Sequence, residues 1–324
     1  MQPAVWKILL LLLSTASLAG AVTFTEDFST NPLANGWQIF GNASLFNWNP
    51  TNQNLEVIWD SSQTNSYFYH RLDTILTDND SFQLGFDLGL LDAVIGTNPD
   101  QPYTFEVAVG FLNLDNATRT NFFRGSGRNA AYGPDNLVEF DFFPAFDIFQ
   151  PTISQVIVST NNAWLYNDNL LDLPPGELFH IAMAYDGGTE TLTTVTTSGG
   201  VQYGPTQLIK VPDGFDFRAN AVSINCYSEQ HSDGSILAHG TIGNIIVTEP
   251  PAPVQNLSGG FAQGVWQAQF LGRSNWFYTL ERTADFLAWT NVACASLVDD
   301  ENLFLQDTNP PSGMAFYRVE AERP

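Results

Sequence analysis

The stretch LFHIAMAYDGGTETLTTVTT, residues 178–197, is the clearest indication of the fold, because apolar residues alternate with small or polar ones on both sides of a turn. In its first half the large apolar side chains occupy every second position, which places them on one face of an extended strand: Phe179, Ile181, Met183 and Tyr185. The Asp-Gly-Gly that follows supplies positions that tolerate positive φ, as a tight turn requires. The stretch therefore predicts a β-hairpin with one buried face.

Short alternating runs of the same kind recur throughout residues 55–248. They are separated by Asn, Asp, Gly and Pro, and almost no segment has the period of an amphipathic helix. This spacing predicts an all-β fold, a sandwich of two antiparallel sheets. We expect strands at residues 55–59, 66–70, 82–90, 105–112, 137–143, 155–159, 222–227 and 241–248.

Three segments resemble the concanavalin A-like (laminin G-like) domains of lectins and glucanases. The hairpin is similar to one that recurs near the end of those domains. FTEDF at residues 24–28, followed by a Gly-Trp pair, resembles their first strand, and GSILAHGTIGNIIV at residues 234–247 resembles their last, which pairs beside the first. The resemblance covers residues 22–248 and implies a jelly-roll sandwich. It is a likeness of fold and not a catalytic signature.

The N-terminus predicts the compartment of the protein. Lys7 precedes an apolar run, and small residues end at Ala21, which is the pattern of a secretory signal peptide over residues 1–21. No later stretch is apolar enough to insert into a bilayer. We expect a secreted or extracellular protein, with the cell surface included.

A second domain is expected after the sandwich. The prolines of EPPAP, residues 249–253, remove backbone donors and favour an extended linker over residues 249–257. Beyond it, WFYTLE and the closing FYRV resemble a small β module at the tail of many secreted bacterial proteins, here residues 258–324. The chain is thus expected to be a bacterial protein with a sandwich followed by a small β domain.

Charge and cysteine content exclude several classes of function. The chain has 34 acidic and 11 basic residues, a formal charge of −23, so it repels phosphate backbones and nucleic acid is not an expected partner. The two cysteines, Cys226 and Cys294, provide neither a disulfide framework nor a thiolate metal cluster. Both are expected to be buried as small apolar residues.

The strongest chemical candidate is VEFDFFP, residues 138–144. The period of a strand sends Glu139, Asp141 and Phe143 to one face and Phe140 to the other. Two carboxylates at neighbouring positions of one face repel each other, so they require a cation, an arginine or open solvent.

This strand resembles the catalytic strand of the lectin-type glucanases, E-x-D-x-E or E-x-D-x-x-E. The resemblance implies Glu139 as nucleophile and Asp141 as its assistant. The general-acid position, however, falls on Phe143 or Pro144, which transfer no proton, and hydrolysis requires a second carboxyl across the scissile bond. Activity would need a carboxylate from elsewhere, such as Asp147. No catalytic residue is therefore assigned.

The same strand resembles the E-F-D-T-F motif of legume-type lectins. That likeness implies that Glu139 and Asp141 hold calcium and a transition metal, with the carbonyl of Phe143 and the carboxylate of Asp147 as further calcium ligands. The His expected in the next strand is Thr152 here, which removes a transition-metal ligand. A calcium site is thus one hypothesis, and the absence of any metal is the other.

Aromatic residues in the early strands are candidates for stacking on sugar rings, whose C–H faces are apolar. One face of a strand must belong to the core, so about half of them are expected to be structural. The candidate carbohydrate-binding residues are Trp48, Trp59, Tyr67 and Tyr69.

The loop at residues 119–135 concentrates three arginines of an acidic chain, Arg119, Arg124 and Arg128. They could grip an acidic sugar or pair locally with Asp115 and Asp135, and local pairing is the favoured interpretation.

These observations favour a secreted, noncatalytic, lectin-like protein that recognises a polysaccharide or glycoconjugate. Two alternatives stay open: a glycoside hydrolase related to the lectin-type glucanases, and a structural or adhesive protein of the cell envelope. The sequence does not fix the glycan or the oligomeric state.

Overall fold

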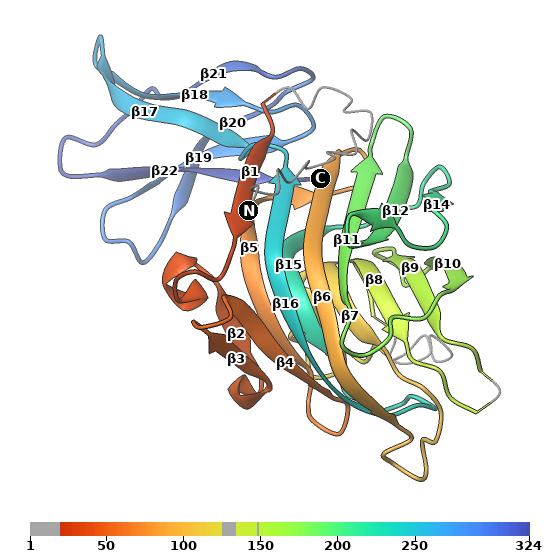
Figure 1. Cartoon of the computed structure of the whole chain (residues 1–324). Helices are drawn as coiled ribbons and strands as arrows, with labels where there is room; N and C mark the ends of the chain where they lie inside the picture. Colours follow the sequence, from red (N-terminus) through yellow and green to blue (C-terminus); the bar gives the residue numbers. More distant parts are fainter. Residues whose placement is uncertain (1–19, 125–133, 148) are drawn as a thin grey trace, which may run out of the picture. The chain divides into compact units, whose positions relative to one another are not determined.

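The computed structural model describes residues 20–124, 134–147 and 149–324 (Figure 1). The chain divides into two compact units, Met1–Pro250 and Pro251–Pro324. The predicted signal peptide lies outside the described residues, except for Gly20 and Ala21. Within the part of the chain that is described, no helix has the length and hydropathy needed to span a bilayer.

The first sheet of the larger unit has nine strands in the order β13-β12-β11-β6-β16-β4-β3, with β1 on β16 and β14 on β12. The predicted hairpin forms its β11 and β12, with Tyr185 opposite Leu192. The last long strand pairs with the first, Val22 opposite Glu249, as the sequence predicted. The strands are β1 (Val22–Glu26), β3 (Phe46–Asn49), β4 (Asn54–Asp60), β6 (Phe82–Ile95), β11 (Leu178–Asp186), β12 (Thr191–Ser198), β13 (Val201–Gln202), β14 (Gln207–Lys210) and β16 (Ile236–Glu249).

The second sheet has seven strands in the order β10-β9-β8-β7-β15-β5-β2. One short helix, α1 (Leu114–Ala117), follows β7, and two 3-10 turns, η1 (Pro32–Asn35) and η2 (Ala43–Leu45), lie near the N-terminus. The strands are β2 (Gln38–Phe40), β5 (Ser66–Leu76), β7 (Val107–Leu112), β8 (Leu137–Phe143), β9 (Thr152–Val158), β10 (Trp164–Leu170) and β15 (Ala219–Cys226).

The two sheets lie face to face (Figure 1). Aromatic and branched side chains fill the space between them. Phe86 of β6 contacts Phe140 of β8 with ring centroids 5.8 Å apart, and Phe82 contacts Phe111 at 5.1 Å. Burial alternates along β4, β6 and β11, so the period of two in the sequence is the period of the core. The predicted all-β sandwich of two antiparallel sheets is confirmed.

Five strands of the sandwich are not among those expected from the sequence: β2, β3, β10, β13 and β14. Four of them have at most four residues, too few to show a period. The fifth, β10, reads WLYNDNL, and its Asn and Asp residues suggest a turn rather than an edge strand.

The smaller unit contains two three-stranded antiparallel sheets, β17-β18-β21 and β20-β19-β22. The first of these strands begins at Val254, inside the stretch for which the sequence predicts a linker, because Val254 already pairs with Gly272. The strands are β17 (Val254–Ala262), β18 (Val265–Gly272), β19 (Phe277–Thr283), β20 (Thr290–Ser296), β21 (Glu301–Asp307) and β22 (Phe316–Glu322).

The two cysteines differ in environment, and both are free thiols. Cys226 is buried in the sandwich as expected, and burial raises the pKa of its thiol. The expectation for Cys294 is wrong, because this residue lies on β20, an edge strand of its sheet, and is exposed.

Candidate functional site

The site begins with the outer face of β8. Phe140 points to the core between the sheets, so Glu139 and Asp141 point to the opposite side of the seven-stranded sheet. Gly110 of β7 lies opposite Glu139. A Cβ at this glycine would lie 2.3 Å from the carbonyl oxygen of Val138 and 2.7 Å from the Cα of Glu139. Only glycine therefore fits at the position beside Glu139.

Arg124 satisfies the two carboxylates of β8. Its Nε donates to Oε2 of Glu139 at 3.1 Å, and its Nη2 donates to Oδ2 of Asp141 at 2.5 Å. A third carboxylate, Glu106, places Oε1 3.9 Å from the same Nε. All four side chains are buried, with at most 4% of the side chain exposed. The requirement for a cation or an arginine is thus met by an arginine from the segment after β7.

This pairing differs from the local pairing expected for the arginines of residues 119–135. Arg119 does lie near Asp135, at 3.9 Å between Nη1 and Oδ2. Asp115 lies 4.0 Å from Arg71 of β5 instead. Arg124 turns inward to β8, and Arg128 lies outside the described residues.

Three carboxyl groups share one guanidinium in this cluster. Burial acts to lower the pKa of Arg124, but Asp141, Glu106 and Glu139 outweigh it and raise that pKa above its ordinary value. Burial also raises the pKa of Asp141, against the opposing effect of Arg124. It raises the pKa of Glu106 to about 7, with the Arg124 charge lowering it and the Glu139 charge raising it further. Near neutral pH, Glu106 is therefore close to the midpoint of its own titration.

The second oxygen of Glu139 accepts hydrogen bonds from β15, which lies on the far side of β7, and from the region directly after β15. Nδ2 of Asn225 donates to Oε1 at 2.7 Å, and the hydroxyl of Tyr227 donates to the same atom. Burial raises the pKa of that hydroxyl, so Tyr227 keeps its proton and acts as a donor. Both carboxylate oxygens of Glu139 therefore accept hydrogen bonds from other groups of the protein.

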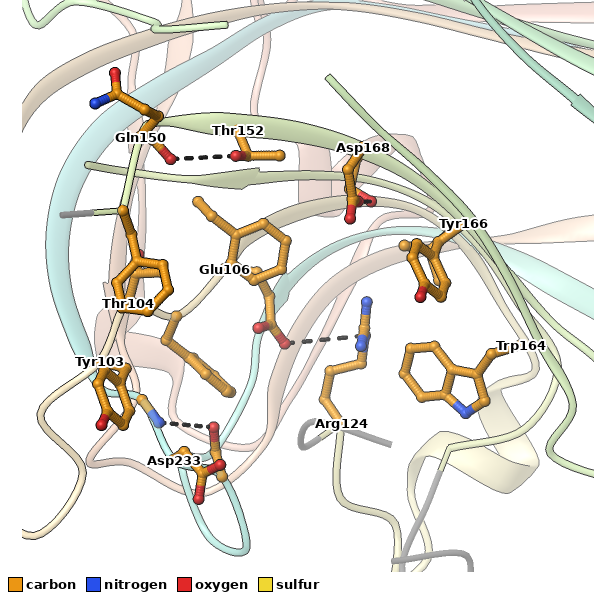
Figure 2. Close-up of a pocket in the computed structure, with 17 residues that line it drawn as sticks. Tyr103, Thr104, Glu106, Arg124, Gln150, Thr152, Trp164, Tyr166, Asp168 and Asp233 are labelled. Carbon is orange, nitrogen blue, oxygen red and sulfur yellow. Dashed lines mark hydrogen bonds and ion pairs between the residues drawn. The ribbon is translucent and has the colours of Figure 1, made fainter. Parts of the chain in front are cut away.

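A pocket of about 690 Å³ lies beside this cluster. In Figure 2, Trp164 and Tyr166 stand on one side beside Arg124, Tyr103 and Asp233 on the other, and Glu106 between them. The lining residues come from the outer faces of β8, β9 and β10, from the segment after β7 that carries Arg124, and from the loops at residues 103–106, 149–150 and 232–234. They are Tyr103, Thr104, Phe105, Glu106, Arg124, Phe143, Phe149, Gln150, Thr152, Ser154, Val156, Trp164, Tyr166, Asp168, Ser232, Asp233 and Gly234.

Strand register sets the polar side of the pocket. Asp141, Ser154 and Asp168 are cross-strand neighbours on β8, β9 and β10. The hydroxyl of Ser154 donates to Oδ1 of Asp168 at 2.5 Å, which fixes that carboxylate toward the sheet. The ring of Trp164 lies 4.7 Å from the guanidinium carbon of Arg124, so the buried cluster also positions one aromatic wall.

Glu106 connects the buried cluster with the pocket. It lines the cavity although the residue is only 4% exposed. Its Oε1 has no hydrogen-bond partner in the described part of the chain. A buried oxygen without a partner is costly, so this atom is ready to accept or share a hydrogen bond with a ligand.

None of the four residues predicted to bind carbohydrate lines the pocket. Trp59 is 1% exposed within the core, and Trp48 is partly buried with its Nε1 donating to the carbonyl of Phe28. Tyr67 and Tyr69 share the outer face of β5 but are buried. Their hydroxyls donate to the carbonyl of Ala117 and to Oε1 of Gln38.

The four residues of the predicted calcium site fall in different surroundings. Glu139 and Asp141 are bound by Arg124, Phe143 lines the pocket, and Asp147 is exposed in a turn with a φ of 51°. Within the described ranges, no group of three His, Cys, Asp or Glu side chains has an arrangement that could hold a metal ion. Calcium binding stays a prediction.

Apart from Phe143 and Arg124, sequence reasoning did not propose the residues that line the pocket. Trp164, Tyr166 and Asp168 repeat with a period of two, a pattern that places them on one face of a strand once residues 164–170 are read as one. Glu106 and Tyr103 carry no comparable signal, because the fold alone brings their loop to the same pocket as the residues of β10 (Figure 2).

Comparison with solved structures finds legume lectins, which have the concanavalin A-like fold that the sequence suggested. The chain is similar to peanut lectin solved with a nine-residue peptide, at 13% identity and a TM-score of 0.45, over 71% of this chain and 98% of the lectin. It is similar to lectin II from Ulex europaeus at 12% identity and a TM-score of 0.46, over 71% and 99%. It is also similar to the seed lectin of Lotus tetragonolobus at 12% identity and a TM-score of 0.45, over 70% and 98%. No family model and no curated protein sequence matches the chain.

Proposed function

We propose that the sandwich is a noncatalytic carbohydrate-binding domain that holds a saccharide in the pocket beside β10. The observation that carries the proposal is the lining of that pocket, which combines aromatic rings with hydroxyl, amide and carboxylate groups. A sugar ring has apolar C–H faces and a rim of hydroxyls, so it needs both kinds of partner.

Each part of a sugar has a partner in this arrangement. Trp164 and Tyr166 supply aromatic surface, and Tyr166 is 66% exposed, so a ligand reaches it without displacing protein atoms. Ser154, Gln150 and Asp168 supply hydrogen-bonding groups on the floor and rim. A cavity of about 690 Å³ is within the range of small-ligand sites.

The surroundings of β8 support a binding role over a catalytic one. Glu139 and Asp141 have no exposed side-chain surface and are held by Arg124. Hydrolysis with retention requires two carboxyl groups on either side of a bound glycosidic bond. Two carboxylates that already share a guanidinium beneath the surface do not meet that requirement.

A glycoside hydrolase is the second candidate, and Glu106 is the observation that favours it. This carboxyl lines the pocket, and its raised pKa of about 7 lets it donate a proton near neutral pH, as a general acid must. Glu106 would supply the general acid, whose position in the strand that resembles the glucanases falls on Phe143 or Pro144.

The compartment and the partner follow from the sequence and belong to the same proposal. The N-terminal segment has the pattern of a signal peptide, so the protein acts outside the cytoplasm on an extracellular polysaccharide or glycoconjugate. Fractionation of expressing cells, with the protein followed by antibody, tests this part.

A glycan array followed by calorimetry on the strongest binder tests the binding proposal. We expect Trp164→Ala to weaken binding about tenfold or more, because the aromatic wall is removed. Leu170→Ala is the matched control, since Leu170 is an exposed residue of the same strand outside the pocket lining. Equal affinity of both variants and the wild type would contradict the assigned site.

Incubation with β-glucans, agars and carrageenans separates binding from hydrolysis. The proposed function predicts no release of reducing ends. Release that disappears in Glu106→Gln would instead establish the hydrolase, with Glu106 as its acid.

A further inference from the structure

We infer that the pocket prefers a saccharide with a free ammonium group, so that its ligand class is an amine-bearing sugar such as an oligomer of glucosamine. This inference rests on the proposed function, because it takes the pocket as the sugar site and adds the charge of the ligand.

Carboxyl groups surround the cavity. Asp168 lies on the side of β10, Asp233 on the opposite side, and Glu106 between them (Figure 2). A ligand in the pocket therefore meets acidic groups from three directions. An ammonium group is complementary to them, whereas the carboxylate of a uronic acid is repelled.

The positive charge of Arg124 in the pocket is already paired with carboxyl groups of the protein. Among the described residues that line it, Arg124 is the sole Lys, Arg or His. Its guanidinium donates to Glu139 at 3.1 Å and to Asp141 at 2.5 Å, and neither of these carboxylates lines the cavity. The arginine is thus engaged from behind and adds little attraction for an anion, so the field in the cavity is negative.

Glu106 gives the ammonium group of the ligand a specific contact point. The residue is 4% exposed, lines the cavity and has an Oε1 without a hydrogen-bond partner in the described ranges. An ammonium group carries three donors and forms charge-assisted hydrogen bonds with carboxylates. Because its pKa is about 7, Glu106 is mostly protonated at about pH 6 in the free protein, and an ammonium group beside it would favour the ionised form. The buried setting of Glu106 makes the resulting bond stronger than it would be in water.

The aromatic side chains that line the pocket also favour a ligand with a positive charge. The faces of tryptophan and tyrosine attract cations within about 6 Å through the ring quadrupole. Trp164 already makes such a contact with Arg124 at 4.7 Å, and Tyr166 presents an exposed ring on the same strand. A glucosamine unit would place its apolar face on a ring and its ammonium beside a carboxylate.

Two tetrasaccharides of the same shape test the inference. Chitotetraose and cellotetraose differ at one ring position of each unit, where the first has an ammonium group and the second a hydroxyl. We expect calorimetry in dilute buffer at about pH 6 to show chitotetraose binding roughly five- to tenfold more tightly. The advantage should shrink in about 1 M salt, because salt screens exposed charges.

Substitutions show whether the preference is local. Asp168→Asn keeps the shape of the side chain but removes its charge, so we expect the loss of affinity to be several-fold greater for chitotetraose than for cellotetraose. Asp172→Asn is the matched control, because it removes one negative charge from an exposed residue outside the lining. An equal loss in both variants would assign the effect to the net charge of the protein and overturn the inference.

The outcomes separate this inference from the proposed function. Equal binding of the two tetrasaccharides, lost in both cases with Trp164→Ala, would overturn the charge preference and leave the sugar site in place. Binding of neutral or acidic glycans alone on the array would overturn it in the same way. If no saccharide of any charge binds, the proposed function fails and the inference fails with it.

Discussion

At the scale of single residues, Arg124 determines what the carboxylates of β8 can do. Glu139 and Asp141 are completely buried, and a buried charge is stable only if it is paired. Arg124 supplies that pair and also contacts the ring of Trp164, so one side chain links the stability of the sheet with the wall of the pocket.

Replacing Arg124 by methionine should destabilise the sandwich by about 3–5 kcal/mol, because two buried carboxylates lose their partner. Chemical denaturation measures this loss. The matched control is Arg119→Met, which breaks a half-exposed ion pair of the same segment and should cost less than about 1 kcal/mol. Similar losses in the two variants would contradict the assigned role. Combining Arg124→Met with Glu139→Gln and Asp141→Asn should recover much of the stability.

Glu106 should make stability depend on pH. Its pKa is raised from 4.5 to about 7 in the folded protein, so between these values the folded state keeps a proton that the unfolded state has released. The free energy of unfolding therefore falls as pH rises from about 4.5 to 7, by up to about 3 kcal/mol.

Glu106→Gln removes this titration. The variant should match the wild type near pH 4 and be the more stable protein near pH 8, as measured by denaturant unfolding across that range. The charge of Glu106 also contributes to the raised pKa of Asp141, so the difference between the two proteins measures the loss of Glu106 together with its effect on Asp141. If the free energies of unfolding of the two proteins changed with pH in the same way, the raised pKa of Glu106 would be ruled out.

At the scale of elements, the position of a strand in the sheet decides whether its outer face is available. The central strands β7, β8 and β15 carry buried groups on that face, such as Glu139 and Asn225. The edge strand β10 presents Tyr166 and Leu170 to solvent. The pocket therefore forms toward the edge of the sheet, although the conspicuous carboxylate motif lies at its centre.

The contact between β7 and β8 depends on Gly110. We expect Gly110→Ala to destabilise the protein by about 3 kcal/mol, because its Cβ would overlap the backbone of β8 and displace Glu139. Gly243→Ala is the matched control, since this strand glycine of β16 faces open space. Thermal unfolding of both variants measures the contrast. An equal effect would show that strand glycines matter here through backbone entropy and not through this contact.

At the scale of the whole molecule, the larger unit contains its own core. The cluster of buried apolar side chains runs from Phe28 to Val247 and includes no residue of Pro251–Pro324. A core that is complete within one unit predicts independent folding of that unit.

A chain that ends at Pro250 should therefore unfold cooperatively and keep the glycan binding of the full protein. Calorimetric unfolding and the same glycan array compare it with the full chain. Failure of the shortened chain to fold, or loss of its ligand, would show that the smaller unit takes part in the function.

Four features are predictable from the amino-acid sequence: the layered all-β architecture, the hairpin of β11 and β12, the pairing of the first strand with the last, and the common face of Glu139 and Asp141. These features follow from a period of two, which is a local property of the chain. Three further features become visible only in the folded chain: Arg124 pairs with those carboxylates, Glu106 joins them, and the pocket lies toward β10. Such contacts join segments that are far apart in the sequence, and strand order and the course of the loops determine whether these segments lie side by side. No local sequence pattern indicates which side chain will pair with a buried charge.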